Sequence, residues 1–343
     1  MKKLIILSSL FLLNTFISIQ LVAQKTIRYS ETNFENTFHL KSEQVKPNDF
    51  KPAASILHVD SLLILMKIDG PVFFDVVSIK TGRIIATFGK KGDQPGEFFG
   101  PFSIYYEEKT KELVAYDLGL KNVLFYSLPK IVEKKEDGFI KQIHIDDCHP
   151  VRIYPGKNSY MAALMGTKDG DCFAELDASG KVRTYFGKYP EIIVNYNKLL
   201  GHSLFSIYAG VNSEYSINSY HFWDRIEIYK DKELTNTLEG PNYDEFHVAK
   251  NKDHAIKTSE NNYAFGRPIL GKDYFIVAYS GKNYYENNGA EHLFKIGYDG
   301  KLISNYVLDV PIIDYSIDVD WKTGEAYALT DGKNQRIVRF KLK

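Results

Sequence analysis

Short segments in which apolar and polar residues alternate recur along the chain, and three of them begin with closely similar Gly-containing turns. Residues 81–90 are Thr-Gly-Arg-Ile-Ile-Ala-Thr-Phe-Gly-Lys, and residues 179–188 are Ser-Gly-Lys-Val-Arg-Thr-Tyr-Phe-Gly-Lys. Residues 299–306 begin in the same way, with Asp-Gly-Lys-Leu-Ile. A second strand-like segment precedes each of them, at 72–79, 172–177 and 292–298. Alternation with a period of two indicates strands, and a Gly turn between two strands indicates a β-hairpin. The hairpin is therefore the predicted repeating element.

Two further apolar segments lie upstream of the hairpins, for example at 56–59 and 62–66 before the first one. Four short strands per unit are typical of a β-propeller blade. We predict six such units, over residues 54–88, 101–145, 151–186, 203–238, 263–308 and 314–342. The predicted fold is an all-β, six-bladed β-propeller with four-stranded blades, in a single domain over residues 24–343.

The last unit shows only three strands, while residues 37–40 form a spare strand near the N-terminus. We expect this strand to complete the last blade, because closing the ring leaves no free sheet edge. Residues 190–200 and 244–262 fit the repeat poorly and are predicted to be short helices or loops between blades.

The composition supports a β-rich protein and argues against nucleic acid as a partner. The chain of 343 residues has 43 basic and 43 acidic side chains, so its formal net charge is zero. The protein therefore has no overall positive field that would attract nucleic acid, which is a polyanion. The 24 Tyr and 22 Phe residues are of the kind that strands favour.

The first 23 residues resemble an export signal. Two lysines follow Met1, residues 4–13 are apolar, and Ala23 ends a short segment typical of a cleavage site. Polar residues between positions 14 and 20 interrupt the apolar segment before it reaches the ~20 residues that span a bilayer. We expect a signal peptide at 1–23, a periplasmic or secreted mature chain with no stable membrane insertion, and a monomer.

Two cysteines, Cys148 and Cys172, leave two alternatives open. An exported chain permits a disulfide between them, whereas a domain of this size is stable with two buried free thiols.

Residues 92–101, Gly-Asp-Gln-Pro-Gly-Glu-Phe-Phe-Gly-Pro, resemble the linker of NHL-type repeats, which leads through a proline into the innermost strand of the next blade. The whole mature chain is similar to the TolB-like six-bladed β-propellers that Gram-negative bacteria export. This resemblance implies the propeller fold, an envelope location and a binding role, and it provides no catalytic motif.

The motifs that usually mark catalytic chemistry are missing from the sequence. It contains no Gly-x-Ser-x-Gly, no His-Glu-x-x-His and no phosphate-binding Gly loop. The polar cluster at 144–149 has no partner with ligand spacing, so a loop at a blade edge explains it better than a metal site. We expect no catalytic residues, no metal site and no cofactor.

The innermost strands of a propeller border its central channel, where side chains from different blades meet. The predicted inner strands place six residues there: His58, Tyr105, Arg152, Tyr154, Tyr208 and Arg267. Arg152 and Arg267 suit a carboxylate, a phosphate or an acidic sugar, because a guanidinium binds such groups with two hydrogen bonds. The alternative is an arginine paired with an acidic residue of a neighbouring blade.

The sequence thus predicts a ligand-binding or protein-interaction module of the cell envelope, without catalysis of its own. An envelope protein or a small acidic or carbohydrate ligand is the expected partner. The alternative is a propeller enzyme, a hydrolase or lyase acting on a sugar or lactone, with its site at the mouth of the channel.

Overall fold

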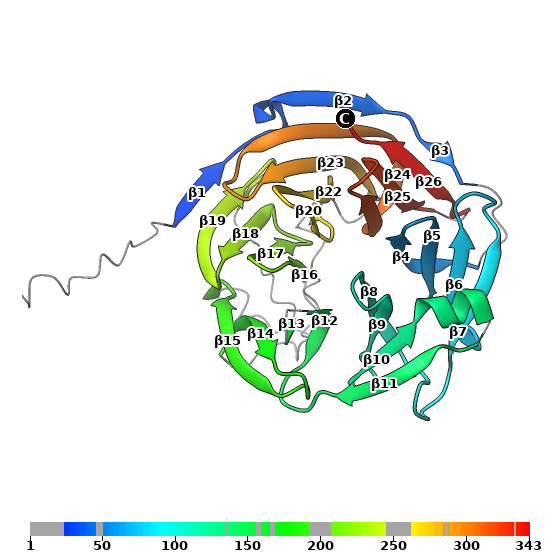
Figure 1. Ribbon diagram of the computed structural model, residues 1–343. Helices are drawn as coiled ribbons and strands as arrows, with labels where there is room; N and C mark the ends of the chain where they lie inside the picture. The colour runs from blue at the N-terminus through cyan, green and yellow to red at the C-terminus, as the bar shows by residue number, and fades with distance from the viewer. Residues whose placement is uncertain are drawn as a thin grey trace, which may run out of the picture.

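Small sheets arranged in a ring make up the computed structural model of the protein (Figure 1). The structure describes residues 24–45, 51–134, 136–155, 159–164, 169–191, 207–244, 262–283, 286, 289–332 and 334–343. The predicted signal peptide, at residues 1–23, lies outside the described residues, as do most of the segments 190–200 and 244–262.

Three sheets are four-stranded meanders in which each strand pairs with the next one along the chain. The first contains β4 (Ala53–Val59), β5 (Leu62–Lys67), β6 (Val72–Ser78) and β7 (Ile84–Lys90). The second contains β8 (Pro101–Glu107), β9 (Glu112–Asp117), β10 (Asn122–Ser127) and β11 (Phe139–His144), with the short helix η2 (Lys130–Lys134) before β11. The third contains β12 (Pro150–Pro155), β13 (Tyr160–Leu164), β14 (Asp171–Leu176) and β15 (Val182–Lys188).

The fourth sheet has the same meander plus one strand from the N-terminus. Its strands are β16 (Ile207–Val211), β17 (Tyr215–Tyr220), β18 (Arg225–Lys230), β19 (Glu233–Glu239) and β1 (Lys25–Arg28). These four sheets are blades of a propeller, and they match four of the predicted units.

The remaining strands form one nine-stranded mixed sheet. Seven of its strands are β20 (Asn262–Phe265), β21 (Ile269–Leu270), β22 (Tyr274–Asn283), β23 (Ala290–Gly297), β24 (Leu302–Asp320), β25 (Glu325–Thr330) and β26 (Ile337–Lys341). The other two come from the N-terminal segment. The sheet is continuous because β24 is 19 residues long and pairs first with β23 and then with β25.

The N-terminal segment wraps around the outside of the ring (Figure 1). After β1 and the 3-10 turn η1 (Glu31–Asn33), β2 (Asn36–Leu40) runs parallel to residues 304–308 of β24, and β3 (Glu43–Gln44) pairs with β26. We call residues 24–45 the N-terminal strap. An N-terminal strand therefore closes the ring, as predicted.

The assignment of residues 37–40 to the last unit is wrong. Phe38 stacks on Tyr306 of β24 with ring centroids 5.8 Å apart, and Leu40 is buried in the same cluster. The strand that covers β26 is β3 instead. The two residues of β3, Glu43 and Gln44, are both exposed, so this strand has no apolar alternation by which it could be recognised.

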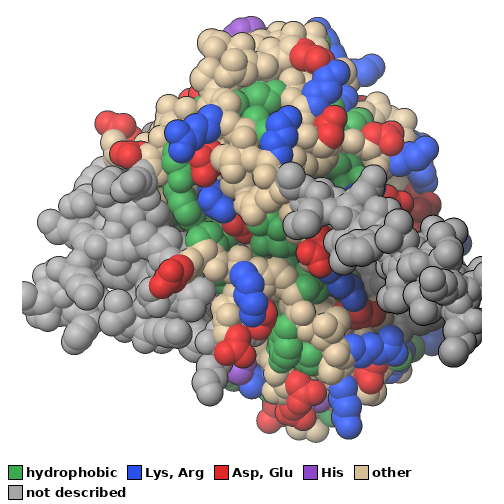
Figure 2. All heavy atoms as spheres, turned by 90° about the vertical axis from the view of Figure 1, so that its left-hand side faces the viewer, with side chains coloured by type: hydrophobic (Ala, Val, Ile, Leu, Met, Phe, Trp, Pro, Cys, Tyr) green, Lys and Arg blue, Asp and Glu red, His purple; other side chains and the backbone are tan. Residues whose placement is uncertain are grey.

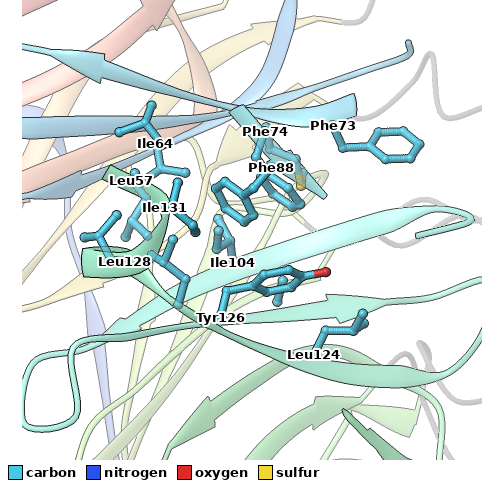
Figure 3. Packing of buried hydrophobic residues seen from close by; sticks show 14 of the residues in the cluster. Leu57, Ile64, Phe73, Phe74, Phe88, Ile104, Leu124, Tyr126, Leu128 and Ile131 are labelled. Carbon is cyan, nitrogen blue, oxygen red and sulfur yellow. The ribbon is translucent and has the colours of Figure 1, made fainter. Parts of the chain in front are cut away.

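The core lies between adjacent sheets, where their apolar faces meet. Between the first two blades, Phe98 from the connecting loop is fully buried. The centroid of its ring lies 5.2 Å from that of Phe74 and 5.8 Å from that of Tyr126. Figure 3 shows the cluster around these rings. Gly89 has φ +77°, and a Cβ there would lie 2.6 Å from the ring of Phe74. Gly96 has φ +83°, and its carbonyl accepts a hydrogen bond of 2.5 Å from the Tyr126 hydroxyl. Gly89, at the end of β7, and Gly96, in the linker at 92–101, thus serve the crossing between blades.

The two cysteines are buried and free. Cys148 packs between the second and third blades and Cys172 between the third and fourth, so the alternative with two free thiols describes this structure.

Charges of both signs are interspersed on the side of the ring that carries β15 and β19 (Figure 2). Within the described residues, no helix combines the length and the apolar character needed to cross a bilayer.

Candidate functional site

A cavity of about 750 Å³ opens where the innermost strands end. These strands, β4, β8, β12 and β16, lie around the centre of the ring (Figure 1). Residues 267–270 and the turn from β24 to β25 complete its wall. The volume lies within the range of pockets that hold small-molecule ligands, roughly 300 to 1,000 Å³.

The structure brings five of the six predicted residues together in this one cavity: His58, Tyr105, Arg152, Tyr154 and Arg267. His58 and Tyr105 come from β4 and β8. Arg152 and Tyr154 both come from β12, and Arg267 lies between β20 and β21. Tyr208 belongs to β16, but its side chain lies outside the described residues.

Arg267 is half-buried and retains unused hydrogen-bonding capacity. Its Nη2 donates a hydrogen bond of 2.6 Å to the carbonyl of Ile317. Its Nε is buried and has no hydrogen-bond partner within the described part of the chain. Among those residues, no carboxylate forms an ion pair with Arg267. The positive charge of Arg267 nevertheless acts to lower the pKa of the nearby Asp318. Arg267 thus interacts with Asp318 through its charge and forms no direct ion pair with an acidic residue of the described chain.

Arg152 is a buried cation on the facing strand β12. The positive charges of Arg152 and Arg267 both act on the Tyr154 hydroxyl, so the two arginines lie near the same side chain. Burial outweighs both charges and raises the pKa of Tyr154. The Tyr154 hydroxyl donates a hydrogen bond to the carbonyl of Ala209 and so links β12 to β16.

Tyr105 lies beside this group, with its ring edge-on to that of Tyr154 at 6.4 Å. Burial, reinforced by the negative charge of Glu107, raises its pKa to about 12. Both tyrosines are therefore neutral at physiological pH. The Tyr105 hydroxyl can donate or accept a hydrogen bond, whereas the Tyr154 hydroxyl, which already donates to Ala209, can only accept one more.

His58 is held rigidly at the wall of the cavity. Its side chain is 9% exposed, and its ring stacks on Tyr327 at 5.1 Å with an interplanar angle of 1°. Its Nε2 has no hydrogen-bond partner among the described residues, and the nearest carboxylate oxygen, Oδ2 of Asp320, is 3.9 Å away. This separation exceeds a hydrogen-bond length, so the two groups face each other across a gap.

Two acidic residues of β24 stand on the same wall, Asp318 and Asp320. The backbone N–H of His58 donates to Oδ2 of Asp318 at 2.7 Å. Burial raises the pKa of Asp318, and the charge of Arg267 and this hydrogen bond offset the effect only in part.

Asp320 behaves in the opposite way. Burial acts to raise its pKa, but the Thr323 hydroxyl and the backbone N–H of Lys322 donate to its carboxylate and hold the pKa below the usual value. Asp320 is therefore ionised at neutral pH, with its Oδ2 turned toward His58.

Charged residues and one large aromatic residue surround the mouth of the cavity. The Nζ of Lys322 lies 3.7 Å from Oδ1 of Asp60 and 3.4 Å from Oε1 of Glu108. Its side chain therefore bridges the turns that follow β4 and β8. Trp321 is 39% exposed and lines the same mouth.

Asp318, Asp320 and Trp321 lie within the last predicted unit, at 314–342, but were not among the predicted site residues. The signal was present in the alternation Ile317-Asp318-Val319-Asp320, in which two acidic residues share the face of a strand expected to be innermost.

Comparisons with known proteins agree with this architecture. No protein-family model matches the chain, and no curated protein matches it by sequence. A protein of Bacteroides fragilis, provisionally described as exported, superposes with a TM-score of 0.59 at 12% identity, over 93% of this chain and 99% of the other. A member of the DUF4221 family from Bacteroides vulgatus superposes with a TM-score of 0.55 at 9% identity, over 89% of this chain and 96% of the other.

The chain is an all-β propeller. At identities this low the likeness concerns the fold alone, and the binding roles of His58, Tyr105, Arg152, Tyr154, Tyr208 and Arg267 stay predictions.

Proposed function

We propose that this protein is an exported six-bladed propeller that binds a small acidic ligand in its central cavity, as a binding module of the cell envelope without catalysis of its own. The blade count follows from reading the nine-stranded sheet as two blades that share β24. The first half of β24 is the outer strand of one blade and the second half is the inner strand of the next. This reading agrees with the six predicted units and with the TolB-like resemblance.

Export is supported by the pattern of residues 1–23 and by the description of the similar B. fragilis protein as exported. The expected location is the periplasm or the cell exterior, and the expected state is a monomer that forms a single domain.

One observation carries the proposal of an acidic ligand: Arg267 lines the cavity, forms no ion pair with a carboxylate in the described chain, and has a buried Nε without a hydrogen-bond partner there. A buried donor that stays unpaired costs about 1–3 kcal/mol, and more for a charged group. A carboxylate or phosphate group in the cavity would neutralise the charge of the guanidinium. The second cation, Arg152, lies near the same tyrosine and adds to the attraction.

The test is a thermal-shift titration of the mature protein with small carboxylates and inorganic phosphate. A ligand at 100 times its Kd stabilises the folded state by about 2.7 kcal/mol, which gives a clear upward shift of Tm. We expect Arg267→Ala to abolish the shift and Arg152→Ala to reduce it. Arg183→Ala, which removes an arginine from the outer strand β15, is the matched control and should bind as the wild type does. Binding that survives both cavity substitutions would disprove an arginine-centred site.

A second candidate function, a hydrolase or lyase acting on a sugar or lactone, is favoured by Asp318. A carboxyl group with a raised pKa in a cavity is suited to act as a general acid. Turnover of such a substrate by the wild type, lost in Asp318→Asn while binding persists, would establish the enzyme in place of the binding module.

A further inference from the structure

We propose that the acidic ligand is the C-terminal end of a peptide, whose carboxylate binds in the central cavity near Arg152 and Arg267 and whose preceding residues lie in a second, adjoining cavity. This inference rests on the proposed function and adds the chemical class of the ligand and a second part of its binding site.

The second cavity, of about 700 Å³, lies beside the central one. The two adjoin, because Asn212 and Ser213, in the turn from β16 to β17, line both. A second segment follows the same course, since residues 267–270 line the central cavity and residues 271–273 line the second one. Together the two cavities offer more space than the roughly 300 to 1,000 Å³ of a pocket for one small molecule. An elongated ligand that enters both would use this space.

Hydrogen bonds hold the wall that the two cavities share. Nδ2 of Asn212 donates to the Tyr298 hydroxyl at 3.0 Å, and this hydroxyl donates to the carbonyl of Gly271 at 2.8 Å. Oδ1 of Asn212 accepts from the backbone N–H groups of Glu214 and Tyr215 at 2.9 and 2.8 Å. The turn after β16 is thereby tied to the segment after β21, so the place where the cavities meet is organised before a ligand arrives.

The aromatic residues of the second cavity argue against a sugar chain. Tyr215 stacks on Tyr298, with ring centroids 3.9 Å apart and an interplanar angle of 6°. The ammonium group of Lys230 lies 5.8 Å from the centroid of the Tyr215 ring, over the face that Tyr298 leaves open. Tyr298 itself is buried. A sugar stacks its C–H groups on the negative face of an aromatic ring, and both faces of Tyr215 are already covered.

The charges of the second cavity suit a peptide. Glu214, Lys272 and Asp273 are exposed around it, whereas Lys301 is paired with Glu35 of the N-terminal strap at 3.0 Å. Exposed charges of both signs can select among the charged side chains of a peptide, because complementary charges favour one sequence and like charges disfavour another. A small carboxylic acid held at the arginines of the central cavity does not extend to them.

Isothermal titration calorimetry on the mature protein tests this inference with four kinds of probe. The first is N-acetylalanine, a carboxylate with a single residue. The second is a set of N-acetylated tetrapeptides that end in alanine and carry Ala, Lys or Glu at the other positions, and the third is the C-terminal amide of the tightest binder. The fourth is tetragalacturonate, an acidic sugar chain. We expect at least one tetrapeptide to bind ten times or more tightly than N-acetylalanine, and its amide to bind at least ten times more weakly than the acid.

Two charge reversals in the second cavity leave the central cavity unchanged. Lys272→Glu should shift the preference from Glu-containing toward Lys-containing tetrapeptides, and Asp273→Lys should shift it the other way, each by about fivefold at low ionic strength. Both variants should bind N-acetylalanine as the wild type does. Lys181→Glu is the matched control, because Lys181 is also exposed but lies in the turn from β14 to β15, outside both cavities, so its reversal should shift nothing.

The outcomes separate the two proposals. If N-acetylalanine binds as tightly as every tetrapeptide, or if both reversals in the second cavity leave the preference unchanged, the peptide is excluded and the acidic-ligand site stands. Tetragalacturonate that binds more tightly than every tetrapeptide would replace the peptide by a sugar chain. An amide that binds as tightly as its acid would show that the carboxylate does not lie at the arginines. If no acid among these probes binds, both proposals fail.

Discussion

Replacement of Phe98 by alanine probes how the first two blades are held together. Phe98 belongs to the connecting loop, and its side chain is fully buried. It meets Phe74 edge-on at 5.2 Å and stacks on Tyr126 at 5.8 Å. Its backbone N–H donates to the carbonyl of Lys90 at 2.8 Å, and its own carbonyl accepts from Gly92 at 2.9 Å. The substitution leaves these backbone bonds available, so its effect reports on the ring alone.

The expected magnitude follows from complete burial. Truncation of a buried Phe to Ala removes the transfer free energy of the ring and leaves a cavity, which together cost about 3–5 kcal/mol. The neighbouring residue supplies the control, because Phe99 is 65% exposed. Full burial of such a side chain is worth about 1.5–3 kcal/mol, so Phe99→Ala should cost at most about 1 kcal/mol.

Urea unfolding followed by tryptophan fluorescence measures both variants against the wild type. We expect a clearly lower midpoint for Phe98→Ala with an unchanged slope, and a midpoint near that of the wild type for Phe99→Ala. If both substitutions cost the same free energy, the Phe98 ring does not lock the two blades and the packing argument is refuted.

Three further predictions concern other regions. Because the pKa of Asp318 is raised in the folded state, the folded protein binds its proton more tightly than the unfolded chain, and the wild type loses stability as pH rises from about 4 through the raised pKa. Asp318→Asn removes this loss. The urea midpoint of the variant should therefore rise relative to that of the wild type as pH increases from 4 to 7, and a difference in midpoint that does not change with pH would contradict the assignment. Burial raises the pKa of Cys148 to about 12 and also raises that of Cys172, so a thiol reagent should find no reactive group in the native protein and two after denaturation without reductant. A disulfide would leave the denatured protein unreactive. A chain that begins at residue 46 lacks the N-terminal strap and exposes the edges of β19, β24 and β26, so it should self-associate in sedimentation velocity, whereas a monomeric and equally stable truncation would show that the strap is dispensable.

Much of the site was predictable because it depends on local alternation. In a strand, successive side chains point to opposite faces, so an innermost strand identified from its pattern already places its channel-facing residues. His58, Tyr105, Arg152 and Tyr154 follow this rule, and all four line the cavity. Arg267 also lines the cavity, but it lies between β20 and β21, so strand alternation does not account for its position.

The sequence did not reveal that Asp318, Asp320 and Trp321 line the cavity, because their surroundings depend on residues far away in the chain. Asp318 and Asp320 are adjacent positions on one face of β24, but only the folded structure turns one toward the backbone of His58 and the other toward its imidazole. The Trp321 indole packs against Gly271 and Tyr274, which lie about 50 residues earlier in the chain, so its position could not be read from the local sequence.

The sequence by itself determined the class of the fold, the hairpin repeat and the inward positions, since these follow from period-two alternation and turn chemistry within short segments. Only the tertiary structure decided which edge each N-terminal strand covers. Residues 37–40 can pair with any open strand edge, and the choice of β24 over β26 depends on the packing of Phe38 and Leu40 against side chains more than 260 residues away in sequence. The same holds for the unpaired Nε of Arg267 and the gap beside His58, because a missing partner is a property of the assembled ring and has no counterpart in the local pattern.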